Sequence, residues 1–377
     1  MSTDAQSRND TAITNPAIIP AADHAPGETV TAGNEDDSSR PDSLGRRVLQ
    51  PRTLISFAIA GFIVYFVFGR LDDPAEVWRQ LRGANPVLVI AALITFYATF
   101  VIRAIRWLRM LRQVGINEAH GYHLPGVPGT FVILILSWFA NCVVPARLGD
   151  AYRSFLLKER TGASFGMGLG TILAERLIDL VVLVALVLSS GAVVFGTHAP
   201  GRAEQAFLLG LIVVVVGVLG ALMLYWLREH FERRLPERFS GHFNRLHRGI
   251  FDILRRPLPF GLMSVLIWLG DGLRLYLVAW SLGARLTFAE ALVVALLSAL
   301  VTIIPITPAG IGLVEGFMIW MLPQVGVPQD TAAAIAILDR VVTYWSLIAV
   351  GLPLYLVNLR RDISVPTPPA EAARVGG

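Results

Sequence analysis

The sequence predicts an all-α polytopic membrane protein, with about six full spans and two broken, re-entrant helix pairs arranged as an inverted repeat. The chain of 377 residues is 54% hydrophobic and only 16% charged, which is typical of polytopic membrane proteins rather than soluble enzymes. Its apolar residues form runs near the length of about 20 residues that a helix needs to cross a bilayer. Prolines, glycines and ionisable residues interrupt two of these regions, which predicts broken helices.

Both ends of the chain are polar. Residues 1–45 are rich in Ser, Thr, Asp, Ala and Pro and show no apolar periodicity. We expect a disordered cytoplasmic tail here, because these residues bury too little apolar surface to offset the entropy lost on ordering. Residues 362–377 are expected to form a short polar tail. No cleavable signal peptide is expected, and the membrane domain is predicted to cover residues 46–361.

The full spans divide between two halves of this domain, one at about 53–196 and the other at about 206–357. The expected spans are 53–69, 86–106, 177–196, 206–227, 258–281 and 332–357. Basic residues flank them in four places, at 46–52, 103–112, 228–256 and 360–361. Because loops rich in Lys and Arg stay in the cytoplasm, both termini and a basic loop at 228–256 are expected to be cytoplasmic.

Some charged residues fall within or beside the spans themselves. The second span ends in four arginines, Arg103, Arg106, Arg109 and Arg112. The first two are deep enough to face a lipid headgroup, whereas the last two are expected to snorkel to the inner headgroups. In the span 258–281, Asp271 and Arg274 are one helical turn apart and are expected to pair.

The stretch 145–180 carries many ionisable residues between long apolar runs. Charges at membrane depth are costly unless they face a partner or a hydrated cavity, so they favour a functional site. Pro145 and the glycines at 149, 162, 166, 168 and 170 argue against one continuous helix. The spacing of Gly162, Gly166 and Gly170 is also typical of closely approaching helices. The alternative is that 145–163 forms an ordinary solvated loop.

The apolar pieces at 131–144, 288–304 and 311–322 are short for full spans. The basic loops lie on one side of the membrane only if the regions 131–176 and 286–322 make no net crossing. We therefore expect a pair of short re-entrant helices in each region, with a pair of thin full crossings as the alternative.

The two broken regions resemble each other. Pro145-Ala146-Arg147-Leu148-Gly149 matches Pro308-Ala309-Gly310-Ile311-Gly312, and Glu175-Arg176 matches Asp339-Arg340. An odd number of full spans is expected between the breaks, so the two copies enter the membrane from opposite faces. Inverted repeats with broken helices that meet near the midplane are a transporter architecture.

These residues form a spaced set of motifs. The set is Pro145-x-Arg147-x-Gly149-Asp150-x-x-Arg153, then Glu175-Arg176-x-x-Asp179, then Pro308-Ala309-Gly310-x-Gly312-x-x-Glu315. It resembles the flippase-like transmembrane domain family, the membrane portion of lysylphosphatidylglycerol synthetase/flippases and their uncharacterised relatives, over about 50–360. Asp150 stands where the family pattern has Glu, and Ala309 stands where it has Gly. No soluble aminoacyl-transferase domain is expected, so the resemblance does not imply lysyl transfer. It does imply the inner (cytoplasmic) membrane of a prokaryote.

The resemblance implies a lipid translocase, which must carry a polar headgroup across a layer where bare charge is costly. Arginine suits this task because its planar guanidinium binds phosphate bidentately and stays protonated. The expected headgroup contacts are Arg147, Arg153, Arg176 and Arg340. Acidic residues expected to hold them or to relay protons are Asp150, Glu175, Asp179, Glu315 and Asp339. The expected backbone breaks lie at Pro145, Gly149, Pro308, Gly310 and Gly312. The alternative role for Glu175, Arg176 and Asp179 is an ion-pair network that joins helices, and the two roles are compatible.

Two other function classes remain open. A lipid-modifying enzyme is disfavoured because the sequence lacks hydrolase, metal and nucleotide-binding motifs, and no metal or cofactor is expected. Cys142 is expected to pack as a small apolar residue. An accessory subunit of an envelope lipid or glycan assembly complex would need no polar interior, so the buried charges count against it. The expected partners are membrane lipids with anionic headgroups and, for the accessory role, envelope-biosynthesis enzymes. Nucleic acid is not expected, because the basic loops suit anionic lipid.

Overall fold

The computed structural model describes residues 73–144, 148–195, 237–302 and 307–363, with a few single residues between 58 and 69 and at 212. The expected spans at 53–69 and 206–227 lie almost wholly outside the described residues. The N-terminal tail and nearly all of the C-terminal tail lie outside them too. So do two of the predicted site residues, Pro145 and Arg147.

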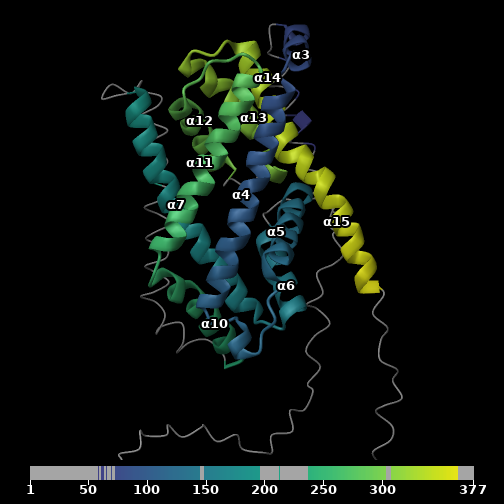
Figure 1. Ribbon diagram of the computed structural model, residues 1–377, viewed down its shortest axis with the longest axis vertical. Helices are drawn as coiled ribbons and strands as arrows, with labels where there is room; N and C mark the ends of the chain where they lie inside the picture. Colours follow the sequence, from purple (N-terminus) through teal and green to yellow (C-terminus); the bar gives the residue numbers. More distant parts are fainter. Residues whose placement is uncertain are drawn as a thin grey trace, which may run out of the picture. The chain divides into compact units, whose positions relative to one another are not determined.

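Every regular element within the described residues is helical (Figure 1). The first half contains α3 (Pro74–Arg82), α4 (Pro86–Gln113), α5 (Gly126–Val143), α6 (Gly149–Thr161) and α7 (Phe165–Phe195). The second half contains α10 (Glu237–Leu254), α11 (Leu258–Ser281), α12 (Phe288–Val301), α13 (Leu313–Met321), α14 (Gln329–Arg340), a π-helical segment (Val341–Trp345) and α15 (Ser346–Ile363).

Five helical segments of this part of the chain are long and apolar enough to cross a membrane. They are Pro86–His120, Gly126–Val143, Phe165–Val194, Leu258–Ser281 and Gln329–Asn358. The α12 helix is apolar but shorter. These findings confirm the predicted class, an all-α polytopic membrane protein.

Two helix boundaries illustrate how well local signals work. The α11 helix has the predicted bounds, because Pro257 stands immediately before it and a turn with Gly283 at a positive φ follows Ser281. The α12 helix begins in a reciprocal cap, in which the backbone N–H of Thr287 donates to the Glu290 carboxylate at 2.7 Å and the Glu290 N–H donates to the Thr287 hydroxyl at 3.3 Å.

The α7 helix corrects the predicted start of the third span. It begins at Phe165 instead of residue 177, and Gly166, Gly168 and Gly170 lie inside it. A Cβ on Gly170 would collide with the Leu246 carbonyl oxygen and lie 3.0 Å from Gly249 Cα in α10. The helical glycines therefore permit close packing, which offsets the usual cost of glycine inside a helix.

The last span also differs from the expectation. The helix begins at Gln329 and continues through the π-helical segment into α15, so Asp339 and Arg340 lie near its middle and not in its first turns. The alanine-rich sequence before Asp339 supports the extra turns. The π-helical segment begins directly after Arg340, and such segments often occur at functional sites.

Both broken helix pairs are present. The α5 helix starts at Gly126 and has 18 residues, which makes it longer than the piece predicted at 131–144 and long enough to cross a membrane. The short α6 helix packs against it. In the second half, α12 and the nine-residue α13 helix form the corresponding pair.

The region 228–256 was expected to be a loop, but α10 occupies its described part. This helix packs against α7 because Gly249 and Gly170 allow their backbones to approach. The α3 helix takes the corresponding position in the other half, since it precedes α4 as α10 precedes α11 and packs against α14.

The α4 and α11 helices run side by side in opposite directions (Figure 1). The N–H of Asn85, before α4, donates to the carbonyl of Ser281 at the end of α11, at 2.8 Å. At the other end of α4, the Gln113 amide donates to the carbonyl of Asp252, shortly before α11, at 2.6 Å. Because both helices precede a broken pair, their antiparallel packing makes the two halves an inverted repeat, as predicted.

Apolar side chains form two clusters around this frame. The larger one joins α4, α11, α12 and α14 and includes Phe100, Leu275 and Leu296. The smaller one joins the second part of α4 to α5 and α6, and it contains Trp107 and Leu157. These clusters hold the helices that carry the charged residues.

Candidate functional site

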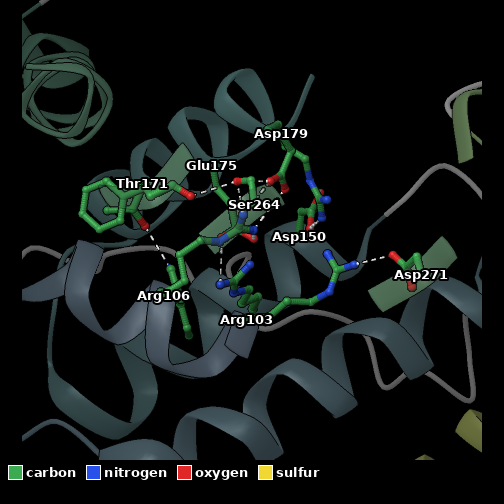
Figure 2. A network of polar contacts seen from close by, with 12 residues as sticks. Arg103, Arg106, Asp150, Thr171, Glu175, Asp179, Ser264 and Asp271 are labelled. Carbon is green, nitrogen blue, oxygen red and sulfur yellow. Dashed lines mark hydrogen bonds and ion pairs between the residues drawn. The ribbon is translucent and has the colours of Figure 1, made fainter. Parts of the chain in front are cut away.

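Arg106 is the centre of a buried ion-pair network in the first half (Figure 2). Its side chain is 0% exposed. One terminal nitrogen donates to Glu175 at 2.7 Å, and the two together bind Asp179 at 2.5 and 3.0 Å. Ser264 of α11 accepts from Arg106 at 2.6 Å and donates to Asp179 at 2.7 Å. The network therefore links α4 and α7 of one half to α11 of the other.

Arg153 belongs to the same network. It lies 3.0 Å from Glu175, and both side chains are almost fully buried. Its guanidinium carbon lies 3.8 Å from the centre of the Trp107 indole, a close cation–π contact. The indole N–H donates to Thr171 at 3.0 Å and is thereby fixed. Arg153, one of the expected headgroup contacts, thus presents no accessible guanidinium in this arrangement and instead joins α6 to α4 and α7.

Arg176 and Asp150 form the more accessible pair of the first half. Arg176 binds Asp150 at 2.8 and 3.3 Å, and the side chains are 33% and 23% exposed. Among the predicted charged site residues of this half that the structure describes, Arg176 and Asp150 have the most exposed side chains.

The start of α6 is held tightly against α5. The Gly149 N–H donates to the Asn141 side chain at 2.8 Å, and the Ser137 hydroxyl donates to the Gly149 carbonyl at 2.8 Å. A Cβ at position 149 would collide with the Ser137 carbonyl oxygen. Glycine is therefore required for close approach here, and this contact places Asp150 in the first turn of α6.

Arg340 and Glu315 form the corresponding pair in the second half. Arg340 of α14 lies 2.8 Å from Glu315, which sits in the first turn of α13. Arg340 also donates to the Gly310 carbonyl at 3.2 Å, and Glu315 accepts from the Gly312 N–H at 2.7 Å. Gly310 and Gly312 have φ of 71° and 82°, and even Ala309 has a positive φ of 47°. The break predicted at Pro308, Gly310 and Gly312 is thus bent around the Arg340 side chain.

The acids that precede these arginines also correspond. Asp339 pairs with Arg274 of α11, as Glu175 pairs with Arg106 of α4. The predicted pairing of Asp271 with Arg274 is looser than expected, at 4.0 Å. Asp271 instead binds Arg103 at 3.0 Å, because the antiparallel packing of α4 and α11 brings these two side chains together.

The structure thus brings most of the predicted site residues it describes into two matched clusters. The sequence singles out Arg103, Arg106, Asp271 and Arg274 but does not identify them as partners of residues in the other helices, and it does not single out Ser264. The spacing of the repeat would have identified Arg106 and Arg274. Arg274 precedes Asp339 by nearly as many residues as Arg106 precedes Glu175. Arg109 and Arg112 are exposed near the end of α4, as a snorkelling position requires. Among the described residues, no group of three or more His, Cys, Asp or Glu side chains can hold a metal ion.

Together, the fold and these clusters define a polytopic α-helical membrane protein with paired intramembrane charge sites in an inverted repeat. Residues 53–351 match the family model described as the lysylphosphatidylglycerol synthase TM region, and the chain belongs to this family.

Several relatives support this assignment. A UPF0104 membrane protein of Methanocaldococcus jannaschii is 29% identical over 230 residues, which are 60% of this chain and 97% of the relative. A UPF0104 membrane protein of Methanothermobacter thermautotrophicus is 23% identical over 78% of this chain and 92% of its own length. A protein of Haloferax volcanii named glycosyltransferase AglD is 28% identical over 78% of this chain, but the match spans only 53% of that protein.

Proposed function

We propose that this protein is a non-enzymatic lipid translocase of the cytoplasmic membrane, which moves a phosphate-bearing lipid between the leaflets. One observation carries the proposal. Arg176 and Arg340 lie in the middle of long membrane helices, and each binds an acid in the first turn of a short helix that follows a break. Paired broken-helix sites in an inverted repeat are the arrangement that alternating access uses.

The chemistry of the two pairs suits a phosphate headgroup. A guanidinium binds a phosphate with two parallel charge-assisted hydrogen bonds. In each pair the carboxylate makes such contacts to the arginine, and a bound phosphate would replace Asp150 or Glu315 there. This exchange keeps the guanidinium paired throughout, which avoids the cost of an isolated charge at membrane depth.

Lipid translocation in proteoliposomes tests this proposal. Tail-labelled anionic and zwitterionic lipids would be reconstituted with the full chain, and an impermeant quencher would report movement to the outer leaflet. We expect Arg176→Gln and Arg340→Gln each to slow movement at least tenfold, which corresponds to the loss of a charge-assisted contact. The matched control is Arg112→Gln, which removes an exposed arginine of α4.

The controls decide between function and folding. All variants would be compared for monodispersity and melting temperature in detergent before reconstitution. Wild-type rates equal to those of empty liposomes for every lipid, or unchanged rates in folded Arg176→Gln and Arg340→Gln, would contradict the proposal.

A second function is favoured by one relative. The protein named glycosyltransferase AglD matches this chain over about half of its own length, so we also propose that such a membrane domain can serve a separate glycosyltransferase as an accessory subunit. Copurification of a glycosyltransferase with the tagged protein, and loss of its activity on deletion, would support this role. Rescue of that activity by Arg176→Gln would separate the accessory role from translocation.

A further inference from the structure

We propose that Arg103 forms a third phosphate-binding site, between the Arg176–Asp150 and Arg340–Glu315 pairs, at the axis that relates the two halves. This inference rests on the proposed function, because it adds a step to the path of the lipid headgroup. In the sequence, Arg103 is deep enough in its span to face a lipid headgroup, but it is not among the expected headgroup contacts.

The position of Arg103 follows from the symmetry of the repeat. Arg106 and Arg274 occupy corresponding positions, and both bind the acid that precedes a site arginine. The same offset in residue number makes Arg103 correspond to Asp271 (271 − 103 = 274 − 106 = 168). Corresponding residues of an inverted repeat touch each other only beside the axis, and Arg103 lies 3.0 Å from Asp271.

Arg103 is far less completely bonded than Arg106. Arg106 makes four hydrogen bonds, to Glu175, Asp179 and Ser264. Among the described residues, Arg103 donates one hydrogen bond, to Asp271 (Figure 2), although its side chain is only 5% exposed. Its buried Nε, like that of Arg106, has no hydrogen-bond partner in the described part of the chain, so the two arginines differ in the bonds that their terminal nitrogens make. A buried donor without a partner is costly, so this guanidinium has unused capacity for an anion.

Two indoles complete the site. The Arg103 guanidinium carbon lies 5.2 Å from the Trp138 ring centre and 5.9 Å from that of Trp268. These cation–π contacts hold the charge without using its N–H groups. The indole N–H of Trp268 is also buried without a partner in the described part of the chain, which adds a second donor for a phosphate oxygen.

The acid on Arg103 has an alternative partner. Asp271 lies 3.0 Å from Arg103 and 4.0 Å from Arg274, one helical turn further along α11. A phosphate that binds Arg103 can therefore displace Asp271 toward Arg274 without leaving the carboxylate unpaired. The exchange repeats the one proposed at Arg176 and Arg340.

Ion pairs lead from this site toward both outer pairs. On one side, Arg106 lies one helical turn from Arg103 in α4 and binds Glu175, the neighbour of Arg176 in the chain. On the other side, Asp271 lies 4.0 Å from Arg274, which pairs with Asp339, the neighbour of Arg340. A phosphate group would thus pass from one guanidinium to the next through a nearly neutral set of ion pairs, which lowers the barrier that a charge meets at membrane depth.

Fluorine NMR of the full-length protein, labelled with 5-fluorotryptophan, tests this site in detergent. Single Trp→Phe variants assign the resonances of Trp138, Trp268 and the exposed control Trp78. Inorganic phosphate and dihexanoyl phosphatidylglycerol are the two probes. We expect saturable shifts of Trp138 and Trp268, but not of Trp78. Shifts with both probes mean that the phosphate group suffices, and shifts with the lipid alone mean that the acyl chains are required.

The decisive variant is the neutral double substitution Arg103→Gln/Asp271→Asn, which leaves no unpaired buried charge. If the pair is only structural, this variant binds like the wild type. If Arg103 binds phosphate, affinity falls about 10- to 100-fold, as for the loss of charged hydrogen bonds. Arg109→Gln, which changes an exposed arginine of the same helix, is the control and should keep the wild-type affinity.

The outcomes separate this inference from the proposed function. Absence of the Trp138 and Trp268 shifts in the wild type, or unchanged affinity in the double variant, overturns the Arg103 site even if the protein moves lipids. Loss of binding in the double variant supports the site even if no lipid is translocated by the wild type.

Discussion

Arg340 lies 2.8 Å from Glu315 in the second half, just as Arg176 lies 2.8 Å from Asp150 in the first. In both pairs a long helix supplies the arginine and the first turn of a short helix supplies the acid. The environments differ, because the side chains of Arg340 and Glu315 are 12% and 8% exposed, against 33% and 23% for Arg176 and Asp150. The Arg340–Glu315 pair is therefore more enclosed than the Arg176–Asp150 pair.

This difference predicts unequal coupling energies. In double-mutant cycles with Arg→Gln and Asp→Asn or Glu→Gln, we expect Arg340 and Glu315 to be coupled by about 2 kcal/mol in the free energy of unfolding. Arg176 and Asp150 should be coupled by about 1 kcal/mol or less, because solvent screens this pair. Unfolding by SDS titration in mixed micelles measures both. Equal coupling would mean that the enclosure seen in the structure has no energetic effect.

Glu175 is expected to be the acid whose loss is most damaging. It binds both Arg106 and Arg153, and all three side chains are almost fully buried. Glu175→Gln would leave two buried guanidiniums with one acid fewer, so we expect a destabilisation of about 3 kcal/mol. Glu118→Gln, which changes an exposed acid, should be neutral. A melting temperature for Glu175→Gln equal to that of the control would contradict the role of the network.

The packing of α7 on α10 gives a third prediction. A Cβ at Gly170 would meet backbone atoms of Leu246 and Gly249, which cannot move aside as a flexible side chain does. Gly170→Val should therefore destabilise the protein by about 2 kcal/mol through overpacking. Gly261→Ala is the matched control, since its Cβ would make one ordinary contact at 3.9 Å, with Val182. Both effects can be followed by thermal denaturation, and similar losses in the two variants would argue against a specific contact at Gly170.

Much of the fold could be predicted from the sequence, because hydropathy and proline positions mark the ends of isolated apolar helices. The bounds of α11 are the clearest case. The start of α7 could not be predicted in this way. Gly166, Gly168 and Gly170 are typical of a break when they are considered alone. Only the tertiary packing shows why the helix continues, because Gly170 faces α10 and Gly168 faces Leu157 and Ser154 of α6. The sequence likewise contains no local signal for the π-helical segment after Arg340.

The candidate site was predictable as a set of charges but not as a set of pairs. The motifs identified Glu175, Arg176 and Asp179, yet the pairing of the two acids depends on Arg106, which lies 69 residues from Glu175 in the sequence. Asp271 shows the same limitation. Its spacing from Arg274 predicts a pair within one helix, but Arg103 of α4 comes closer. Contacts between antiparallel helices depend on the register of the whole repeat, which one local motif does not specify.

The inverted repeat gives the last prediction, which concerns the two helices that precede α4 and α11. Since α4 and α11 are antiparallel, α3 and α10 should face opposite sides of the membrane. Single cysteines at Arg79 in α3 and at Arg248 in α10, both exposed positions, would be introduced after Cys142→Ala removes the buried native thiol. In right-side-out vesicles, an impermeant maleimide should label position 79, whereas position 248 should react only after the membrane is opened. Inside-out vesicles should give the reverse pattern, because the basic α10 region is expected to be cytoplasmic. Labelling of both positions from the same side would rule out the inverted arrangement of the halves. It would also rule out the proposal that the sites at Arg176 and Arg340 serve alternating access from opposite sides of the membrane.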